Sequence, residues 1–328
     1  MRRILPFVLI GGAACAAARP ETVMTTSAPI VIAHRGASGY RPEHTLAAYE
    51  LAIQQGADFI EPDLVITKDG ALVARHEHRI DETTDVGERF PARRTVKHLD
   101  GDSVTGWFVE DFTLAELKTV RARERLPNRS HAYDGQFEIP TFDEVLALAV
   151  RATRERGRPV GVYPETKSPS YFRRIGLPLE EPLVAALKRE LMDRAAAPVF
   201  IQSFDAGSLE RLHAMTSARL VQLLDVSDTA MATTAGLRAI ARYAQGVGVH
   251  KQLVIPSGRA PTSVVADAHA MGLTVHVWTF RSDAPFLAAE YAGDPAAEYR
   301  RFLALGIDGV FSDFPDHAVA AVARRLPR

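Results

Sequence analysis

Hydrophobic and polar positions along the chain follow two alternating periods. Short apolar runs of strand length recur along most of the sequence, and between them apolar residues repeat every three to four positions, as on one face of a helix. The expected strands cover 30–33, 59–66, 72–74, 160–163, 199–201, 220–224, 246–249, 273–278 and 310–311. The expected helices cover 45–55, 141–156, 182–192, 206–215, 230–243, 261–271 and 315–325. Repeated strand-then-helix units favour parallel strands joined by right-handed crossovers.

About eight such units in a chain of 328 residues predict an α/β fold, a closed (β/α)8 TIM barrel. The alternative is a doubly wound open sheet, but no Gly-rich loop of the G-x-G-x-x-G type follows any expected strand. One segment, about 83–138, breaks the rhythm. It is rich in charge, Gly, Pro and Asn and has one modest helical pattern, at 113–123. Long connections in compact domains are usually functional, so we expect an insertion after the second strand region, over the mouth of the barrel.

The N-terminus has the pattern of a secretory signal. Arg2 and Arg3 precede an apolar run at 4–10 and small residues up to 18, which predicts a signal peptide over 1–20 and a mature domain over 21–328. The run is too short to span a bilayer, so we expect an exported protein, periplasmic or secreted, with no transmembrane span after signal removal. Cys15 follows a partial lipobox, so a lipid anchor at Cys15 and plain cleavage after Ala18 both stay open.

Composition narrows the class of partner. The chain has 39 basic and 40 acidic residues, a net charge of −1 and 47% hydrophobic residues, which is typical of a globular protein. Nucleic-acid binding would require a strongly basic balance, so we expect no nucleic-acid partner. No cysteine lies beyond Cys15, so no disulfide can form within the mature domain.

Ionisable residues gather just after the apolar runs, where the carboxyl ends of parallel strands would meet at one face of a barrel. In chain order they are His34, Glu61, Asp63, His76 and Glu165. Glu61 and Asp63 are two positions apart on one strand, so both face the same side. Three converging carboxylates would repel one another unless a cation lay between them, and oxygen ligands alone suit Ca²⁺ or Mg²⁺.

Two histidines beside such a cation are suited to act as acid and base near neutral pH. With a nearby arginine, the set suits an anionic, phosphoryl-type transition state. Other polar residues have weaker signals. From spacing alone, Lys167 is as well explained by a surface ion pair with Glu165, His44 could cap the following helix, and Glu43 could join an interior network. Four other histidines have no comparable group of ionisable neighbours, and we interpret them as structural or surface residues: His131, His213, His250 and His269.

The chain also resembles a known family, the glycerophosphodiester phosphodiesterases, and within it the secreted or periplasmic bacterial type. The ordered motifs are IAHRGASGYRPEHT (32–45), GADFIEPDLVITKDGALVARHEH (56–78), TTDV (83–86), RFP (89–91), DFTLAELK (111–118), IPTFDEVL (139–146), VYPETKSP (162–169), QSFD (202–205) and FSDFPD (311–316). They span almost the whole mature chain, and their order makes the resemblance specific.

The resemblance implies a (β/α)8 barrel that hydrolyses glycerophosphodiesters, such as glycerophosphocholine and glycerophosphoethanolamine, to sn-glycerol 3-phosphate and an alcohol. It implies one divalent cation, and three carboxylates in an exported protein favour Ca²⁺ over Mg²⁺. Carried over by motif, the catalytic histidines are His34 and His76, the metal ligands are Glu61, Asp63 and Glu165, and the substrate-binding residues are Arg35, Lys167, Gln202, Phe204 and Trp278.

Two positions depart from the family pattern. The second motif commonly reads His-Asp, and here it reads His76-Glu77, so a role for Glu77 in orienting His76 is open. Pro62, between two expected ligands, removes a donor from the strand. Two other functions are kept as alternatives: a phospholipase C- or D-like phosphodiesterase acting on intact lipid, and a non-catalytic surface binding protein. The presence of all five catalytic and ligand residues disfavours the binding protein.

Overall fold

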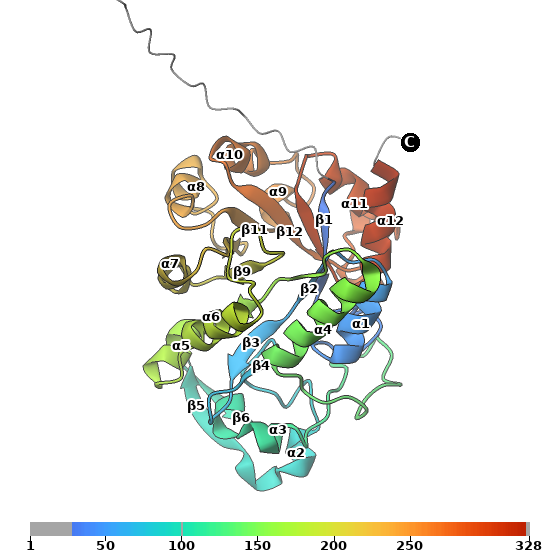
Figure 1. The fold of residues 1–328 in the computed structure, drawn as a ribbon. Helices are drawn as coiled ribbons and strands as arrows, with labels where there is room; N and C mark the ends of the chain where they lie inside the picture. Colours follow the sequence, from blue (N-terminus) through green and yellow to red (C-terminus); the bar gives the residue numbers. More distant parts are fainter. Residues whose placement is uncertain (1–27, 100, 326–328) are drawn as a thin grey trace, which may run out of the picture.

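Parallel strands form a closed barrel ringed by helices (Figure 1). The computed structural model describes residues 28–99 and 101–325, so the expected signal peptide and Cys15 lie outside the described residues. β1 (Ile30–His34) pairs with β13 (Gly309–Ser312) on one side and with β2 (Phe59–Glu61) on the other. The other parallel strands are β3 (Asp63–Ile66), β7 (Gly161–Val162), β8 (Glu165–Thr166), β9 (Phe200–Ser203), β10 (Arg219–Leu224), β11 (Gly246–His250) and β12 (Thr274–Phe280).

The barrel is closed, and a proline splits the strand at two of its eight positions. β2 pairs with β7 and β3 pairs with β8, while β8 continues through β9 to β13 and back to β1. We expected a single strand over 59–66, but Pro62 divides it, and Pro164 divides the next position in the same way. Proline has no N–H to donate to the ladder. The register is nevertheless preserved, since the Glu165 N–H donates to the Pro62 carbonyl at 3.0 Å. The predicted TIM-barrel fold is confirmed.

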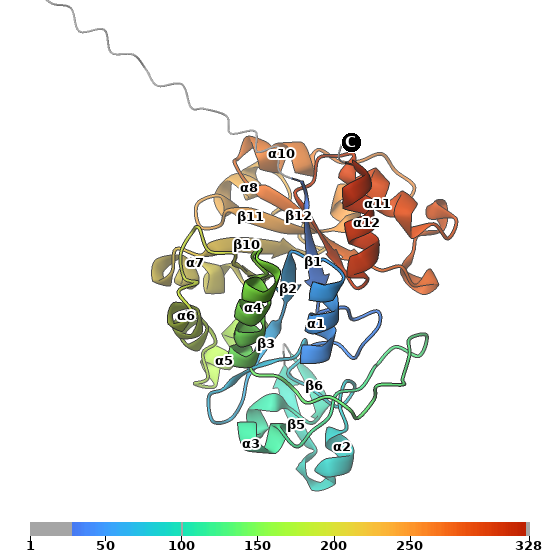
Figure 2. The same cartoon turned by 45° about the vertical axis from the view of Figure 1, so that its right-hand side comes forward.

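Helices cover the outside of the barrel (Figure 2). The longer ones are α1 (Leu46–Gln54), α4 (Phe142–Arg156), α6 (Glu180–Arg189), α7 (Ala206–Met215), α8 (Thr234–Ile240), α10 (Val264–Ala270), α11 (Pro295–Leu303) and α12 (Pro315–Arg325). The sequence pattern missed α11, whose first turn is mostly small residues, and the short helices α5 (Pro169–Arg174) and α9 (Lys251–Val254). α8 is shorter than expected because the Thr233 hydroxyl caps it four residues into the predicted span. None of the described helices has both the length and the apolar character to cross a membrane.

Two apolar cores stabilise the barrel. The larger lies between the strands and the helices, where the outward-facing residues of each strand are fully buried. The smaller fills the barrel interior with Ile32, Phe59, Tyr163, Phe200, Val221 and Phe311. The Tyr163 and Phe200 rings stack at 5.1 Å, and the Tyr163 hydroxyl forms a hydrogen bond with His276 Nδ1 at 2.7 Å, so these buried polar atoms are satisfied. This packed interior is the floor of the site.

The segment after β3 leaves the barrel. β4 (Leu72–Ala74) was expected as a strand, and the structure pairs it antiparallel with β3, so it forms a hairpin arm and not a barrel strand. The chain then forms α2 (Val86–Arg89), two 3₁₀ turns at Pro91–Arg93 and Val109–Asp111, the antiparallel pair β5 (Thr95–Leu99) and β6 (Asp102–Gly106), and α3 (Leu114–Leu117). These elements lie at the end of the molecule toward which β3 points (Figure 1). The helix expected at 113–123 is therefore only one turn long.

Candidate active site

A pocket lies at the carboxyl ends of the strands, above the packed interior. In a strand, residues two positions apart face the same side, so the residue two positions after an interior side chain also points inward. The interior residues Ile32, Phe59, Tyr163, Phe200 and Val221 are followed in this way by the pocket residues His34, Glu61, Glu165, Gln202 and Leu223. The alternation of side chains along each strand therefore supplies both the apolar residues below the pocket and the residues that line its wall.

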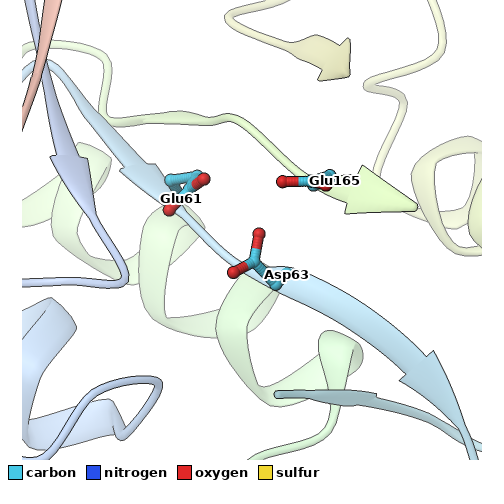
Figure 3. A group of neighbouring side chains, drawn as sticks. All are labelled: Glu61, Asp63 and Glu165. Carbon is cyan, nitrogen blue, oxygen red and sulfur yellow. The ribbon is translucent and has the colours of Figure 1, made fainter. Parts of the chain in front are cut away.

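Three carboxylates converge on one point, as the sequence predicted (Figure 3). Glu61, Asp63 and Glu165 are buried, and one oxygen of each lies within 4.8 Å of the others. Asp63 and Glu165 are direct partners in the β3–β8 register. The position of Glu61 is set by two donors: the Arg35 backbone N–H at 2.7 Å and the Gln202 side-chain amide at 2.8 Å.

The three carboxylates strongly perturb one another. Burial, followed by the charges of Asp63 and Glu165, raises the pKa of Glu61 well above its usual value. Burial also raises the pKa of Glu165 to about 8, while burial of Asp63 is outweighed by the hydrogen bond and charge of His44, which hold its pKa well below the usual range. Asp63 Oδ1 is buried with no hydrogen-bond partner. An orphaned carboxylate oxygen within an all-oxygen donor set fits a hard divalent cation.

His44 holds Asp63 and does not cap the helix, so the expectation for His44 was wrong. Thr45 caps α1, since its side chain accepts from the Ala48 N–H. The His44 ring instead lies fully buried between the Tyr49 hydroxyl at 2.8 Å and Asp63 Oδ2 at 2.9 Å. Its φ of +56° is a left-handed conformation that a non-glycine residue rarely adopts, and such conformations collect at functional sites. The buried Arg75 guanidinium donates to the His44 carbonyl at 2.9 Å and keeps this turn in place.

His34 ends β1 and is held from behind by Asp313, which follows β13. His34 Nδ1 lies 2.6 Å from Asp313 Oδ1. The pKa of Asp313 is well below the usual range despite its burial, so the carboxylate can only accept and Nδ1 must carry the proton. Burial and the nearby Arg35 lower the pKa of His34 to about 4, so the ring is neutral at pH 7. The lone pair on Nε2 is therefore free to accept a proton in the pocket.

His76 reaches the same pocket from the hairpin arm after β4. Its Nδ1 lies 2.7 Å from Glu77 Oε1, and its Nε2 accepts from the Lys167 ammonium at 3.2 Å. Glu77 thus contacts His76 directly, in spite of the departure from the family motif. Burial, then the charges of Arg35 and Lys167, lower the pKa of His76 to about 4. Both histidines are neutral near pH 7, and a carboxylate holds Nδ1 in each.

Two basic side chains, Arg35 and Lys167, complete the polar wall of the pocket. Arg35 sits immediately after His34 with a φ of +61°, and its guanidinium pairs with Glu43 at 3.1 Å and lies 3.6 Å from Asp63. The tight turn that presents Arg35 requires glycine next, because a Cβ on Gly36 would lie 2.7 Å from Ala48. Lys167 is buried against Glu165 at 2.9 Å, so the interpretation of this pair as a surface ion pair does not hold.

The apolar wall consists of Phe204 and Trp278. Their rings meet edge to face at 5.7 Å, and Phe204 is 42% exposed at the rim. The Trp278 indole N–H donates to the Gly248 carbonyl at 2.9 Å, which fixes its plane. His250 packs against Trp278 at 4.9 Å and caps α9, consistent with a structural role. Every predicted substrate-binding residue therefore lines this one pocket.

Sequence reasoning missed the residues that hold the site from outside. Asp313 lies inside the FSDFPD motif but received no role, although a carboxylate just after a barrel strand is the signal that identified Glu61. Arg281 lines the pocket after β12 and lies 3.2 Å from Asp313. Arg129 comes from a segment without a periodic pattern, so no local signal marked it. Arg75 directly follows the expected strand 72–74 but received no role.

Two histidines beside three carboxylates that could hold a cation, at the mouth of a parallel barrel, are an arrangement typical of (β/α)8-barrel hydrolases. The chain belongs to the glycerophosphoryl diester phosphodiesterase family, whose model matches residues 34–317. It is therefore an enzyme of the phosphoric diester hydrolase class, which removes the non-catalytic binding protein from consideration.

Curated relatives and solved structures agree with this assignment. The chain is 38% identical to glycerophosphodiester phosphodiesterase GDPD6 of Arabidopsis thaliana, over 89% of this chain and 85% of the relative. It is 32% identical to the Haemophilus influenzae glycerophosphodiester phosphodiesterase, over 88% of each chain. Among solved structures, an Oleispira antarctica phosphodiesterase in complex with the product sn-glycerol-3-phosphate has the same fold, with a TM-score of 0.64 at 23% identity over 90% of this chain and 97% of that one.

Proposed function

We propose that this enzyme hydrolyses water-soluble glycerophosphodiesters, such as glycerophosphocholine and glycerophosphoethanolamine, to sn-glycerol 3-phosphate and an alcohol. The observation that carries the proposal is the cluster of three buried carboxylates, two of which line the same pocket as two neutral histidines. The named activity of relatives at 32–38% identity and the product found in the Oleispira antarctica structure support the same substrate class.

Glu61, Asp63 and Glu165 would hold one divalent cation, with Ca²⁺ favoured over Mg²⁺ for a set of three carboxylates. When bound, the cation supplies positive charge for the non-bridging oxygens of the phosphodiester. Arg35 and Lys167 face the same pocket and add their own charge to attract and orient the phosphate. The basic side chains of the pocket are therefore arranged for an anionic substrate.

The two histidines move the protons. One neutral imidazole accepts a proton from the nucleophile at Nε2, and the other, once it has taken up a proton at Nε2, gives that proton to the leaving alkoxide. The nucleophile is either water or the glycerol hydroxyl of the substrate itself, which would form a cyclic phosphate that is opened in a second step. Trapping a cyclic glycerophosphate during turnover would distinguish the second route from the first. Phe204 and Trp278 pack against the carbon skeleton of the substrate, while Gln202 binds Glu61.

A coupled assay for sn-glycerol 3-phosphate tests the proposal. Purified enzyme is incubated with several glycerophosphodiesters, with intact phospholipid as a separate arm, after chelation and after return of Ca²⁺ or Mg²⁺. We expect release from the deacylated diesters only, loss on chelation, and the best recovery with Ca²⁺. Cleavage of intact lipid in preference to the diesters would favour the phospholipase-like alternative. Undiminished turnover in chelator would remove the cation from the mechanism.

Export is a separate proposal, which rests on the sequence of residues 1–20. We propose that the enzyme acts outside the cytoplasm after removal of this segment. The mass of the mature chain, measured for the wild type and for Cys15→Ser, distinguishes an acylated N-terminus at Cys15 from plain cleavage after Ala18. Retention of residues 1–20 in the mature protein would contradict the proposal.

A further inference from the structure

Asp313 has two oxygens with different partners. Oδ1 holds His34, and Oδ2 receives Arg129 Nη2 at 2.5 Å. Asp313 is only 2% exposed, and a buried carboxylate with one side unpaired would be costly and would seek other donors. The hydrogen-bond donor to Oδ2 therefore determines whether Asp313 stays ionised and oriented toward His34.

Arg129 comes from the irregular part of the segment 83–138, far from the barrel in sequence. Its side chain is 6% exposed, which is unusual for an arginine in a loop. Nε and Nη2 form a two-point contact with Asp283, at 3.1 and 2.7 Å, and Nη1 donates to the Ser38 carbonyl at 3.0 Å. One guanidinium thus joins the insertion to the loop after β12, the end of β13 and the turn after β1.

This geometry needs arginine in particular. The planar fork supplies donors in three directions at once, whereas the lysine ammonium is a single point charge. Arg281 also approaches Asp313 Oδ2, at 3.2 Å, but its Nε forms no well-aligned hydrogen bond there. Arg129 is therefore the donor that fixes the orientation of Asp313, and Arg281 contributes charge.

We propose that Arg129 is a positioning residue for catalysis: the insertion uses it to lock Asp313, and through Asp313 the orientation and tautomer of His34. This inference rests on the proposed function, since it assumes that His34 transfers a proton. It assigns the segment 83–138 a specific task, because Arg129 from this insertion completes the support of a group that sits on the first barrel strand.

A double-mutant cycle between Arg129→Met and Asp313→Asn tests the proposal, with turnover of glycerophosphocholine as the readout. Loss of such a supporting contact typically costs about 10- to 100-fold in activity, so we expect kcat of Arg129→Met to fall by that amount with KM nearly unchanged. In the Asp313→Asn background the same substitution should cost little more, because the two residues act through one contact. Arg129→Lys should recover part of the lost kcat.

The matched control is Arg123→Met, which removes an exposed two-point ion pair with Glu88 inside the same insertion. It should retain wild-type kcat. If Arg129→Met does not fold, Asp283→Asn loosens Arg129 without touching Asp313 and should show a smaller loss confined to kcat. Wild-type kcat in Arg129→Met, or full additivity with Asp313→Asn, would overturn the inference. A wild-type enzyme that releases no glycerol 3-phosphate would instead refute the proposed function.

Discussion

The site has two histidine arms, which are built differently. The first consists of His34 and Asp313, and the second consists of His76 and Glu77. His34 ends a central barrel strand, and the carboxylate behind it is buried and held by Arg129. His76 follows the hairpin strand β4, outside the barrel, and the carboxylate beside it, Glu77, is mostly exposed. Both rings are neutral near pH 7, so the difference lies in rigidity and not in charge. The barrel therefore holds one of the two proposed proton-transferring histidines rigidly, and we infer that the hairpin arm leaves the other more adjustable.

The carboxylate cluster is common to both arms, so removing it should have the largest effect. Asp63→Asn replaces a cluster carboxylate whose Oδ1 has no other hydrogen-bond partner. A bound cation contributes several kcal/mol of charge stabilisation, so we expect kcat/KM to fall by at least about a thousandfold and Ca²⁺ binding to weaken. Calorimetric titration with Ca²⁺ beside the turnover assay checks both. Normal activity together with lost Ca²⁺ binding would mean that catalysis by the two histidines does not depend on the carboxylate cluster.

The pH dependence of cation binding should be the next largest effect. Glu165 has a raised pKa of about 8 in the metal-free protein, so it is protonated below that pH and must lose a proton to ligate a cation. For the Glu165 proton alone, affinity therefore rises with pH by about tenfold per unit well below pH 8 and by about 50-fold between pH 6 and 8, before it levels off. Competition titration with a fluorescent Ca²⁺ chelator across this range measures it. A Ca²⁺ affinity that does not change with pH would contradict the prediction that Glu165 keeps its proton in the metal-free protein.

Asp313→Asn addresses the rigid arm alone. An asparagine at this position can present its amide to His34 and favour the wrong tautomer, so we expect kcat to fall about 10- to 100-fold. Because the substitution leaves the cluster intact, Ca²⁺ affinity should remain within a few-fold of wild type. Steady-state kinetics with the same titration separates the two. Equal losses in kcat and in Ca²⁺ affinity would mean that Asp313 supports the cluster and not His34.

Glu77→Gln is the matching change on the adjustable arm, and its effect should be the smallest. The side chain of Glu77 is 63% exposed, so water can replace the lost contact, and exposed ion pairs are worth at most about 1 kcal/mol. We expect kcat to fall by no more than about fivefold. A loss as large as that of Asp313→Asn would remove the distinction between the arms.

Regular alternation made the centre of the site predictable. The barrel, the convergence of Glu61, Asp63 and Glu165, and the pocket position of His34 all follow from strand period and parallel register. The pocket position of Gln202 was predicted only from the family motif. The rest depends on contacts between segments distant in sequence. Pro62 split a strand that the apolar pattern read as continuous, and the His44 ring turned to Asp63 because of a left-handed backbone. Arg129 lies in a loop without hydrophobic periodicity, so the sequence pattern could not predict its position.

The central claim is that His34 and His76 transfer protons beside a cation held by other residues. The most direct measurement compares His34→Ala and His76→Ala with wild type, by turnover of glycerophosphocholine and by Ca²⁺ titration on the same samples. We predict that each substitution lowers kcat by about 10²- to 10⁴-fold, the usual contribution of general acid–base catalysis, while Ca²⁺ affinity stays near wild type. Wild-type kcat in His34→Ala would contradict the account.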